Sequence, residues 1–177
     1  ASKAEYGTTP SANYAYFSGT ALTLDNFTSS TTNTVGIEAD KDIELFLRGT
    51  SSFSTGSMLA IDVDGEVIVE EYDSTGGSLS LTGSSHLVKI TGELELNEGT
   101  VTCVGGGNTV DLGRLNIDDG MLTVTSTNLG IWVRGNVELD NGTLAVSASG
   151  NNGIYIEGNL KLNSGAANIS SAGSIGC

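Results

Sequence analysis

Short runs of alternating apolar and polar residues recur along this chain from residue 35 onward. One complete unit spans Gly130–Val146 and holds three alternating pairs: Ile131 and Val133, Val137 and Leu139, and Leu144 and Val146. Alternation with a period of two residues predicts β-strands, because successive side chains of a strand point to opposite faces. Gly135 and the Asn141-Gly142 dipeptide lie between the pairs and predict the corners that separate three short strands.

The same unit can be aligned with itself over most of the sequence. The apolar pair of the first strand recurs at Ile37/Ala39, Ile61/Val63, Val88/Ile90, Val110/Leu112, Ile131/Val133 and Ile154/Ile156. The second strand recurs at Ile43/Leu45, Val67/Val69, Leu94/Leu96, Leu115/Ile117, Val137/Leu139 and Leu160/Leu162. The third recurs at Phe53 alone, Leu79/Leu81, Val101/Cys103, Leu122/Val124, Leu144/Val146 and Ala167/Ile169. First-strand pairs are 24, 27, 22, 21 and 23 residues apart, and such a near-constant period is the signature of a repeat protein.

A solenoid is the fold that accommodates three strands per repeat. Equivalent strands recur once per period, so each strand stacks on its equivalent in the next coil, and three parallel sheets enclose a common core. We therefore predict an all-β parallel β-helix of about six to seven coils, with neighbouring coils ~4.8 Å apart. The corner after the second strand contains a glycine in four units, which predicts a positive φ at Gly99, Gly120, Gly142 and Gly165.

The first 34 residues fit the repeat poorly and contain a cluster of aromatic side chains: Tyr6, Tyr14, Tyr16, Phe17 and Phe27. The first coil of a stacked-repeat protein would otherwise expose its apolar top, so residues 1–34 are predicted to form a cap and an irregular first coil, in which Ala21–Leu24 is already a strand. Residues 35–177 are predicted to form the β-helix within the same domain. The repeat has barely restarted at Cys177, so we expect the native protein to continue there. The open last coil is expected to stack on another domain or on a second copy.

Three first-strand segments share a further pattern: Gly36-Ile37-Glu38-Ala39-Asp40, Gly130-Ile131-Trp132-Val133 and Gly153-Ile154-Tyr155-Ile156. With the x-x-Gly corner and the Thr-rich strand that follow, these segments resemble rungs of the right-handed parallel β-helices. The resemblance is to the secreted bacterial carbohydrate-binding β-helix domains related to pectate lyases, and it covers residues 35–176. It implies a right-handed coil, a secreted or bacterial cell-surface location, and polysaccharide as the partner.

The charge of the chain restricts its partners. Seven Lys and Arg against 21 Asp and Glu give a net charge of −14, so nucleic acid would be repelled. No run of about 18 apolar residues occurs, and no inserted membrane segment is therefore predicted. The two cysteines are too few for a disulfide framework, and Cys103 occupies an inward position that predicts a small buried side chain.

The only tryptophan of the chain occupies an outward position of the repeat. Trp132 and Tyr155 are predicted to lie side by side on adjacent coils, with Arg134, Glu157 and Asp111 as polar neighbours. Aromatic faces at this spacing can stack on sugar rings, while the polar neighbours bind hydroxyl or carboxylate groups. The alternative interpretation is a cross-strand aromatic pair that only stabilises the sheet, by ~0.2–1 kcal/mol.

Acidic residues gather at the corner between the first and second strands of two early coils. The group is Asp40, Asp42, Asp64 and Glu66, and like charges in register on neighbouring strands repel unless something neutralises them. Ca²⁺ accepts irregular sets of carboxylate ligands, so these four residues are candidate calcium ligands. Alternatively, Lys41 and Lys89 compensate the charge and leave a solvated acidic face.

These features favour a non-catalytic extracellular polysaccharide-binding module, with calcium in the acidic corner as a bridge to anionic sugars. The first alternative is a structural stalk or adhesin spacer whose acidity only keeps it soluble. The second is a polysaccharide lyase with Arg134 or Lys89 as the base. The acidic corner lies several coils from Arg134, however, and His86 is the only histidine. Nothing in the spacing predicts a nucleophile with its base.

Overall fold

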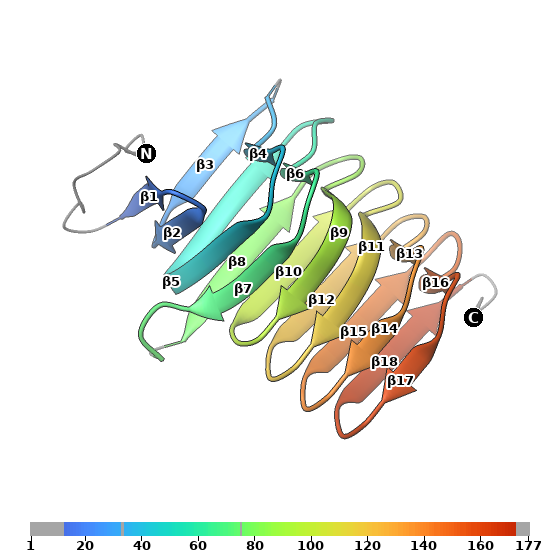
Figure 1. Cartoon of the computed structure of the whole chain (residues 1–177). Coiled ribbons are helices and arrows are strands. Elements are labelled where there is room, and N and C mark those ends of the chain that lie inside the picture. The colour runs from blue at the N-terminus through green and yellow to red at the C-terminus, as the bar shows by residue number, and fades with distance from the viewer. Residues whose placement is uncertain (1–12, 33, 75, 173–177) are drawn as a thin grey trace.

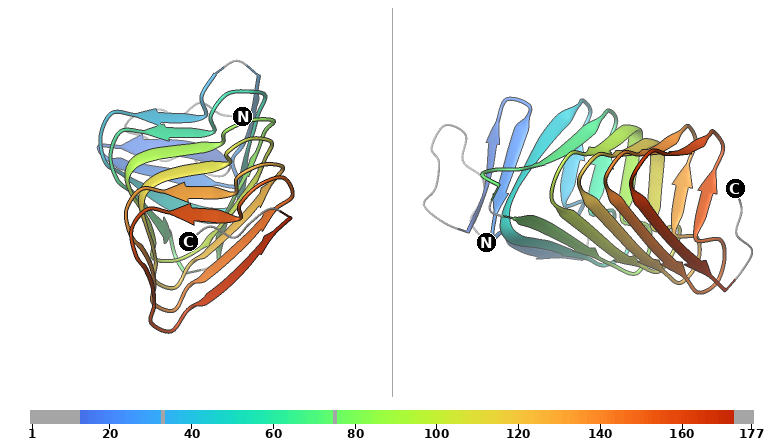
Figure 2. Two further views of the ribbon diagram at one scale, coloured as in Figure 1. Left: turned by 90° about the vertical axis from the view of Figure 1, so that its right-hand side faces the viewer. Right: turned by 90° about the horizontal axis from the view of Figure 1, so that it is seen from below.

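The computed structural model describes residues 13–32, 34–74 and 76–172, and these residues form a parallel β-solenoid of about six coils. The coils follow one another along a single axis, with β1 at one end of the solenoid and β18 at the other (Figure 1). The end-on view in Figure 2 shows three faces that enclose one interior. The all-β parallel fold predicted from the repeat is therefore confirmed, and the right-handed sense implied by the resemblance is compatible with it.

Each face is a parallel sheet built from one strand position of the repeat. Face one comprises β4 (Ile37–Ala39), β6 (Ile61–Val63), the first part of β9 (Val88–Leu96), the first part of β11 (Val110–Ile117), β13 (Ile131–Val133) and β16 (Ile154–Ile156). Face two comprises β2 (Ala21–Asp25), the first part of β5 (Ile43–Thr55), β7 (Val67–Glu71), the second parts of β9 and β11, β14 (Val137–Leu139) and β17 (Leu160–Leu162). Face three comprises β3 (Thr28–Thr31), the second part of β5, β8 (Gly77–Thr82), β10 (Thr100–Gly105), β12 (Met121–Ser126), β15 (Thr143–Ala148) and β18 (Ala166–Ser171).

The register between coils agrees with the alignment of the sequence on all three faces. On face one, Val110 pairs with Val88 on one side and with Ile131 on the other. Leu115 lies between Leu94 and Val137 on face two in the same way. The structure departs from the prediction of three separate strands per coil in three places. Strands β9 and β11 run from face one to face two without a break, and β5 runs from face two to face three. At these places the corner is a bend in one strand.

Inward side chains fill the interior with aliphatic groups stacked coil upon coil. Leu96, Ile117 and Leu139 occupy equivalent positions of three successive coils, and each is completely buried. Burial of one such side chain contributes ~1.5–3 kcal/mol, so the core supplies the driving force for the stack. Cys103 is also completely buried, as predicted, and burial raises the pKa of its thiol to about 12.

Three of the four corner glycines do not have the positive φ that the sequence predicted. Gly99 has a φ of +79°, as expected, but Gly120, Gly142 and Gly165 do not have a positive φ. A Cβ at Gly120 would lie 2.9 Å from Cβ of Leu96, and one at Gly165 would lie 2.5 Å from the carbonyl oxygen of Gly142. These glycines are therefore required by the close approach of neighbouring coils.

The N-terminal end begins with an antiparallel pair. Strand β1 (Tyr14–Ser18) pairs with β2, and β2 confirms the strand expected at Ala21–Leu24. Strands β2 and β3 pair with β5 at the face-two and face-three positions, so they form part of a coil. Among the described residues no strand lies beyond β4 on face one, and an apolar hollow of about 330 Å³ is found there. Tyr6 lies outside the described residues.

The C-terminal end leaves its last coil uncovered in the part of the chain that the structure describes. The inward residues Leu160 and Leu162 of β17 are 39% and 50% exposed, whereas their equivalents Val137 and Leu139 in the preceding coil are buried. Stacking of another domain or copy on this coil stays a prediction. The described residues contain no helix that is long and apolar enough to cross a membrane.

Candidate functional site

The outward side chains of face one form a row that runs along the solenoid axis. In order of the coils the row is Glu38, Asp62, Lys89, Asp111, Trp132 and Tyr155. The strand pairing holds these residues in register, because each one is the direct neighbour of the next across a parallel ladder. The row is charged over its first four coils and aromatic over its last two.

Trp132 and Tyr155 are in contact, as the sequence predicted. Their ring centroids lie 6.4 Å apart and the rings are tilted by 71°, which is an edge-to-face arrangement. This separation is within the 4.5–7 Å range of attractive aromatic pairs. Tyr155 is 42% exposed and Trp132 is half-buried, so both rings keep accessible surface. The two strands that carry them, β13 and β16, are rigidly paired.

Charged groups occupy the flank of the aromatic pair that faces the next corner of the coil. The guanidinium carbon of Arg134 lies 4.8 Å from the centroid of the Trp132 ring, which is a cation–π contact. Nη1 and Nη2 of Arg134 donate to the two carboxylate oxygens of Asp111 at 2.5 and 2.8 Å. This hydrogen-bonded pair raises the pKa of Arg134. The indole Nε1–H of Trp132 donates to Glu157 at 3.1 Å.

The five residues predicted as a carbohydrate site therefore lie together, but their polar groups are already engaged with one another. Arg134 and Asp111 form a bidentate ion pair, and Glu157 accepts from the indole. These contacts fix the orientation of the Trp132 ring. A sugar that used Arg134 or Glu157 directly would have to displace an existing protein contact, which costs free energy.

The opposite flank of the pair is a hollow that sequence reasoning missed. It has a volume of about 280 Å³ and is lined by Trp132, Tyr155, Leu129, Asn108, Asn151 and Asn152. Asn108, Leu129 and Asn152 each come two residues before the first inward residue of face one, where earlier coils have Val35, Leu59 and His86. The signal was therefore present in the sequence as asparagines at this position only in late coils.

Of the four residues predicted to bind calcium, Asp42 and Glu66 line the same groove. Asp40 and Asp64 are exposed, and Oδ1 of Asp42 accepts the backbone N–H of Glu66 at 2.8 Å, which caps a corner. Within the described ranges, no group of three or more His, Cys, Asp or Glu side chains is arranged to hold a metal ion. The calcium site stays a prediction.

Carboxylate crowding is centred instead on Glu95, on the outer side of face two. Burial raises the pKa of Glu95, and the nearby charges of Glu66, Asp118 and Glu93 raise it further. Part of the acidic surface is compensated, because Nζ of Lys89 lies 3.3 Å from Oδ1 of Asp62. Asp62 is not one of the four candidate calcium ligands, so the compensation of those four residues by Lys41 and Lys89 stays a prediction.

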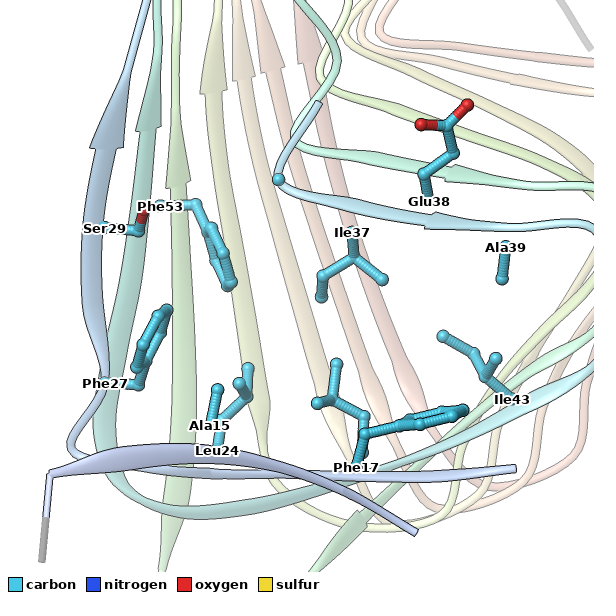
Figure 3. Close-up of a pocket in the computed structure, with 12 residues that line it drawn as sticks. Ala15, Phe17, Leu24, Phe27, Ser29, Ile37, Glu38, Ala39, Ile43 and Phe53 are labelled. Carbon is cyan, nitrogen blue, oxygen red and sulfur yellow. The ribbon is translucent and has the colours of Figure 1, made fainter. Parts of the chain in front are cut away.

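Two further hollows are not lined by Trp132 or Tyr155. A groove of about 540 Å³ follows the corner between faces one and two, with Asp42 and Glu66 at one end and Arg114 and Arg134 at the other. The apolar hollow at the N-terminal end is lined by Phe17, Leu24, Phe27, Ile37, Ile43 and Phe53, while the carboxylate of Glu38 points away from it (Figure 3). The groove has no aromatic ring in its lining. The apolar hollow has the exposed ring of Phe17, but its only polar side chains are those of Ser29 and Glu38.

No protein-family model, curated protein sequence or solved structure matches this chain. The class of protein is therefore defined by the fold alone, and it is a parallel β-solenoid. Its function must be inferred from the surface that departs from the repeat.

Proposed function

We propose that this chain is a non-catalytic polysaccharide-binding module of the secreted or bacterial cell-surface kind, related to the pectate-lyase-like β-helices. The sugar binds at the aromatic pair Trp132 and Tyr155. The observation that supports this proposal is the pairing of two accessible aromatic rings with an adjacent hollow of about 280 Å³. A concave site with aromatic walls and a few polar groups is the usual form of a small-molecule or sugar site.

The physical basis is that a pyranose ring has an apolar C–H face and a polar rim of hydroxyl groups. The C–H face gains free energy when it covers an aromatic ring, while the rim needs hydrogen-bond partners. Trp132 is held by Arg134 and Glu157, so little conformational entropy is lost when a sugar settles on it. This preorganisation distinguishes the site from a mobile exposed aromatic residue.

Binding at this site is independent of the acidic corner. Asp42 belongs to the coil that starts at Ile37 and Trp132 to the coil that starts at Ile131, four coils further along, which is ~19 Å at the usual strand spacing. A cation near Asp42 would therefore not contact a sugar on Trp132. Calcium would act only as a second bridge to an anionic polymer.

Affinity electrophoresis in gels that contain soluble polysaccharides tests the proposal. The wild-type chain is expected to be retarded by at least one polysaccharide, and Trp132→Ala or Tyr155→Ala to weaken binding at least about tenfold, which corresponds to ~1.4 kcal/mol. Glu38→Ala is the matched control, because Glu38 occupies the same outward row at the other end of face one. Unretarded migration of the wild type in every polysaccharide would contradict the proposal and favour the spacer alternative.

The lyase alternative is distinguished by its product. Both candidate bases are held in ion pairs, Lys89 with Asp62 and Arg134 with Asp111, so neither is available to remove a proton. A lyase would release unsaturated product that absorbs ultraviolet light from a uronic polymer. Appearance of this absorbance in the wild type, and its loss in Arg134→Ala or Lys89→Ala, would replace the binding proposal by the enzyme alternative.

A further inference from the structure

The two flanks of the aromatic pair differ in chemistry. On the first flank, Arg134, Asp111 and Glu157 are charged and satisfied by contacts within the protein. On the second flank, the hollow is lined by three asparagines and a leucine, and no charged side chain contributes to its lining. A ligand in this hollow therefore meets amide groups and apolar surface.

The hydrogen bonds within the hollow orient two of the amides. Oδ1 of Asn108 accepts from Nδ2 of Asn128 at 3.2 Å, and Oδ1 of Asn151 accepts from the backbone N–H of Asn152 at 2.9 Å. In the described part of the chain, Nδ2 of Asn108 and of Asn151 donates to no protein acceptor. Each amide oxygen thus accepts one hydrogen bond from the protein, while the N–H donors of the same amide are available to a ligand in the hollow.

The available donors match hydroxyl oxygens better than a carboxylate. A sugar carboxylate that enters the hollow loses hydration, and neutral amide donors compensate this loss less than a cationic partner would. The nearest guanidinium, that of Arg134, is bound by both carboxylate oxygens of Asp111 on the other flank. The chain carries a net charge of −14, which further opposes an anionic ligand. Hydroxyl groups accept from amide N–H donors without these penalties.

We propose that the hollow is a subsite for one uncharged sugar residue, and that Asn108 and Asn151 determine this specificity. The pyranose face lies against Trp132 and Tyr155, and two of its hydroxyl oxygens accept from the amide nitrogens. The volume of about 280 Å³ suits a single ring. This inference rests on the proposed function and names its substrate class, which is a neutral polysaccharide.

Isosteric substitutions test the inference, because Asp keeps the shape and the Oδ1 acceptor of Asn but lacks the amide donor. We expect Asn108→Asp and Asn151→Asp each to weaken binding to a neutral polymer about tenfold in isothermal titration calorimetry, with an unchanged melting temperature. Soluble β-glucan, galactomannan and xylan are the neutral probes, and polygalacturonate is the anionic probe. Asn136→Asp is the matched control, since it adds the same charge in the coil of Trp132, and its Oδ1 accepts from the backbone of Asn159 outside the hollow.

The outcomes separate the inference from the proposed function. Weaker binding of Asn108→Asp and Asn151→Asp but not of Asn136→Asp supports the inference. Wild-type affinity in both hollow variants, or binding of polygalacturonate in preference to the three neutral polymers, overturns it. If in those cases Trp132→Ala still abolishes binding, the proposed function stands. Absence of binding to all four polymers overturns both.

Discussion

Face one has aliphatic inward residues along its whole length but outward residues of different chemistry at its two ends. In the early coils the outward row presents Glu38, Asp62 and Lys89, whereas in the last two it presents Trp132 and Tyr155. The backbone pairing of the two regions is the same, and aliphatic side chains fill both interiors. The inward alternation therefore determines the solenoid, whereas the outward positions vary without changing the strand pairing.

The two regions also use their charges differently. In the early region, Lys89 contacts Asp62 through a single Nζ–O pair at 3.3 Å, and Asp42 caps a backbone corner. In the late region, Arg134 binds Asp111 through two hydrogen bonds and also lies over the Trp132 ring. The early charges make local contacts at the surface, whereas the late charges hold an aromatic side chain in place.

The largest expected effect concerns the buried core, which the early and late coils have in common. Leu96→Ala in the coil of Lys89 and Leu139→Ala in the coil of Trp132 should each lower the free energy of unfolding by ~2–5 kcal/mol. Both side chains are completely buried and both neighbour Ile117. Thermal unfolding should show a decrease of about 5–15 °C in each variant. A loss in one variant several times that in the other would contradict the equivalence of the two cores.

A smaller effect is expected at the corners. Gly142→Ala should cost ~1–3 kcal/mol, because the new Cβ would overlap Cγ2 of Ile117 and lie 2.9 Å from the carbonyl oxygen of Gly120. Gly107→Ala is the control, since its Cβ would meet nothing closer than 3.4 Å. Urea unfolding of both variants measures the difference. Equal stability of Gly142→Ala and the wild type would show that the coils can separate at this corner without cost.

Removal of an ion pair should change the free energy of unfolding by less than the core or corner substitutions do. We expect Arg134→Met to lower the free energy of unfolding by ~0.5–1 kcal/mol, because the bidentate pair and the cation–π contact are both lost. Lys89→Met should change it by no more than ~0.5 kcal/mol, as is usual for an exposed pair with one contact. Urea unfolding at low and high salt gives both values. A larger loss for Lys89→Met would reverse the assignment of roles to the two regions.

The smallest effect is a gain of stability. Burial and, to a smaller extent, the neighbouring carboxylates raise the pKa of Glu95 in the folded chain, so this carboxyl group favours folding while it is protonated. The contribution is present below its unfolded pKa of about 4.3 and is lost as the pH rises through the higher folded pKa. Glu95→Gln should therefore raise the free energy of unfolding by ~0.5 kcal/mol at neutral pH.

Two controls apply to Glu95→Gln: the same measurement at acidic pH, and the same substitution at a carboxylate elsewhere on the surface. The gain should shrink towards zero in acid, where the wild-type carboxyl group is also neutral. Glu38→Gln, at an exposed carboxylate of face one, should give a smaller gain at neutral pH. A stabilisation by Glu95→Gln that does not depend on pH would rule out charge repulsion as its cause.

The sequence predicted the fold in detail because the inward alternation repeats six times with little variation. Each apolar pair of the alignment meets its neighbour in the structure, including weak members such as Phe53, which pairs with Leu81. The positions of Trp132 and Tyr155 followed from the same alignment. A register fixed by a buried face leaves little freedom for outward residues, since a slip by one residue would turn every side chain to the wrong side.

The interactions between side chains could not be read from the alignment. Arg134 could have contacted Glu157, but it binds Asp111 in the preceding coil, and Glu157 accepts from the indole of Trp132 instead. These choices depend on rotamers and on competition between partners. The hollow depends on corner residues whose path the strand pattern does not determine. The positive φ predicted for Gly142 was wrong for a related reason. A glycine required by close packing of the coils looks the same in the sequence as a glycine required by a turn.

The most direct test of the proposal uses Trp132 itself, since it is the only tryptophan of the chain. Its fluorescence emission reports on the proposed site without any label. Titration with the neutral polysaccharides should shift the emission and saturate, and Tyr155→Ala should need about ten times more polysaccharide for the same change. An emission spectrum of the folded wild type that stays unchanged in every neutral and uronic polysaccharide would contradict binding at the aromatic pair.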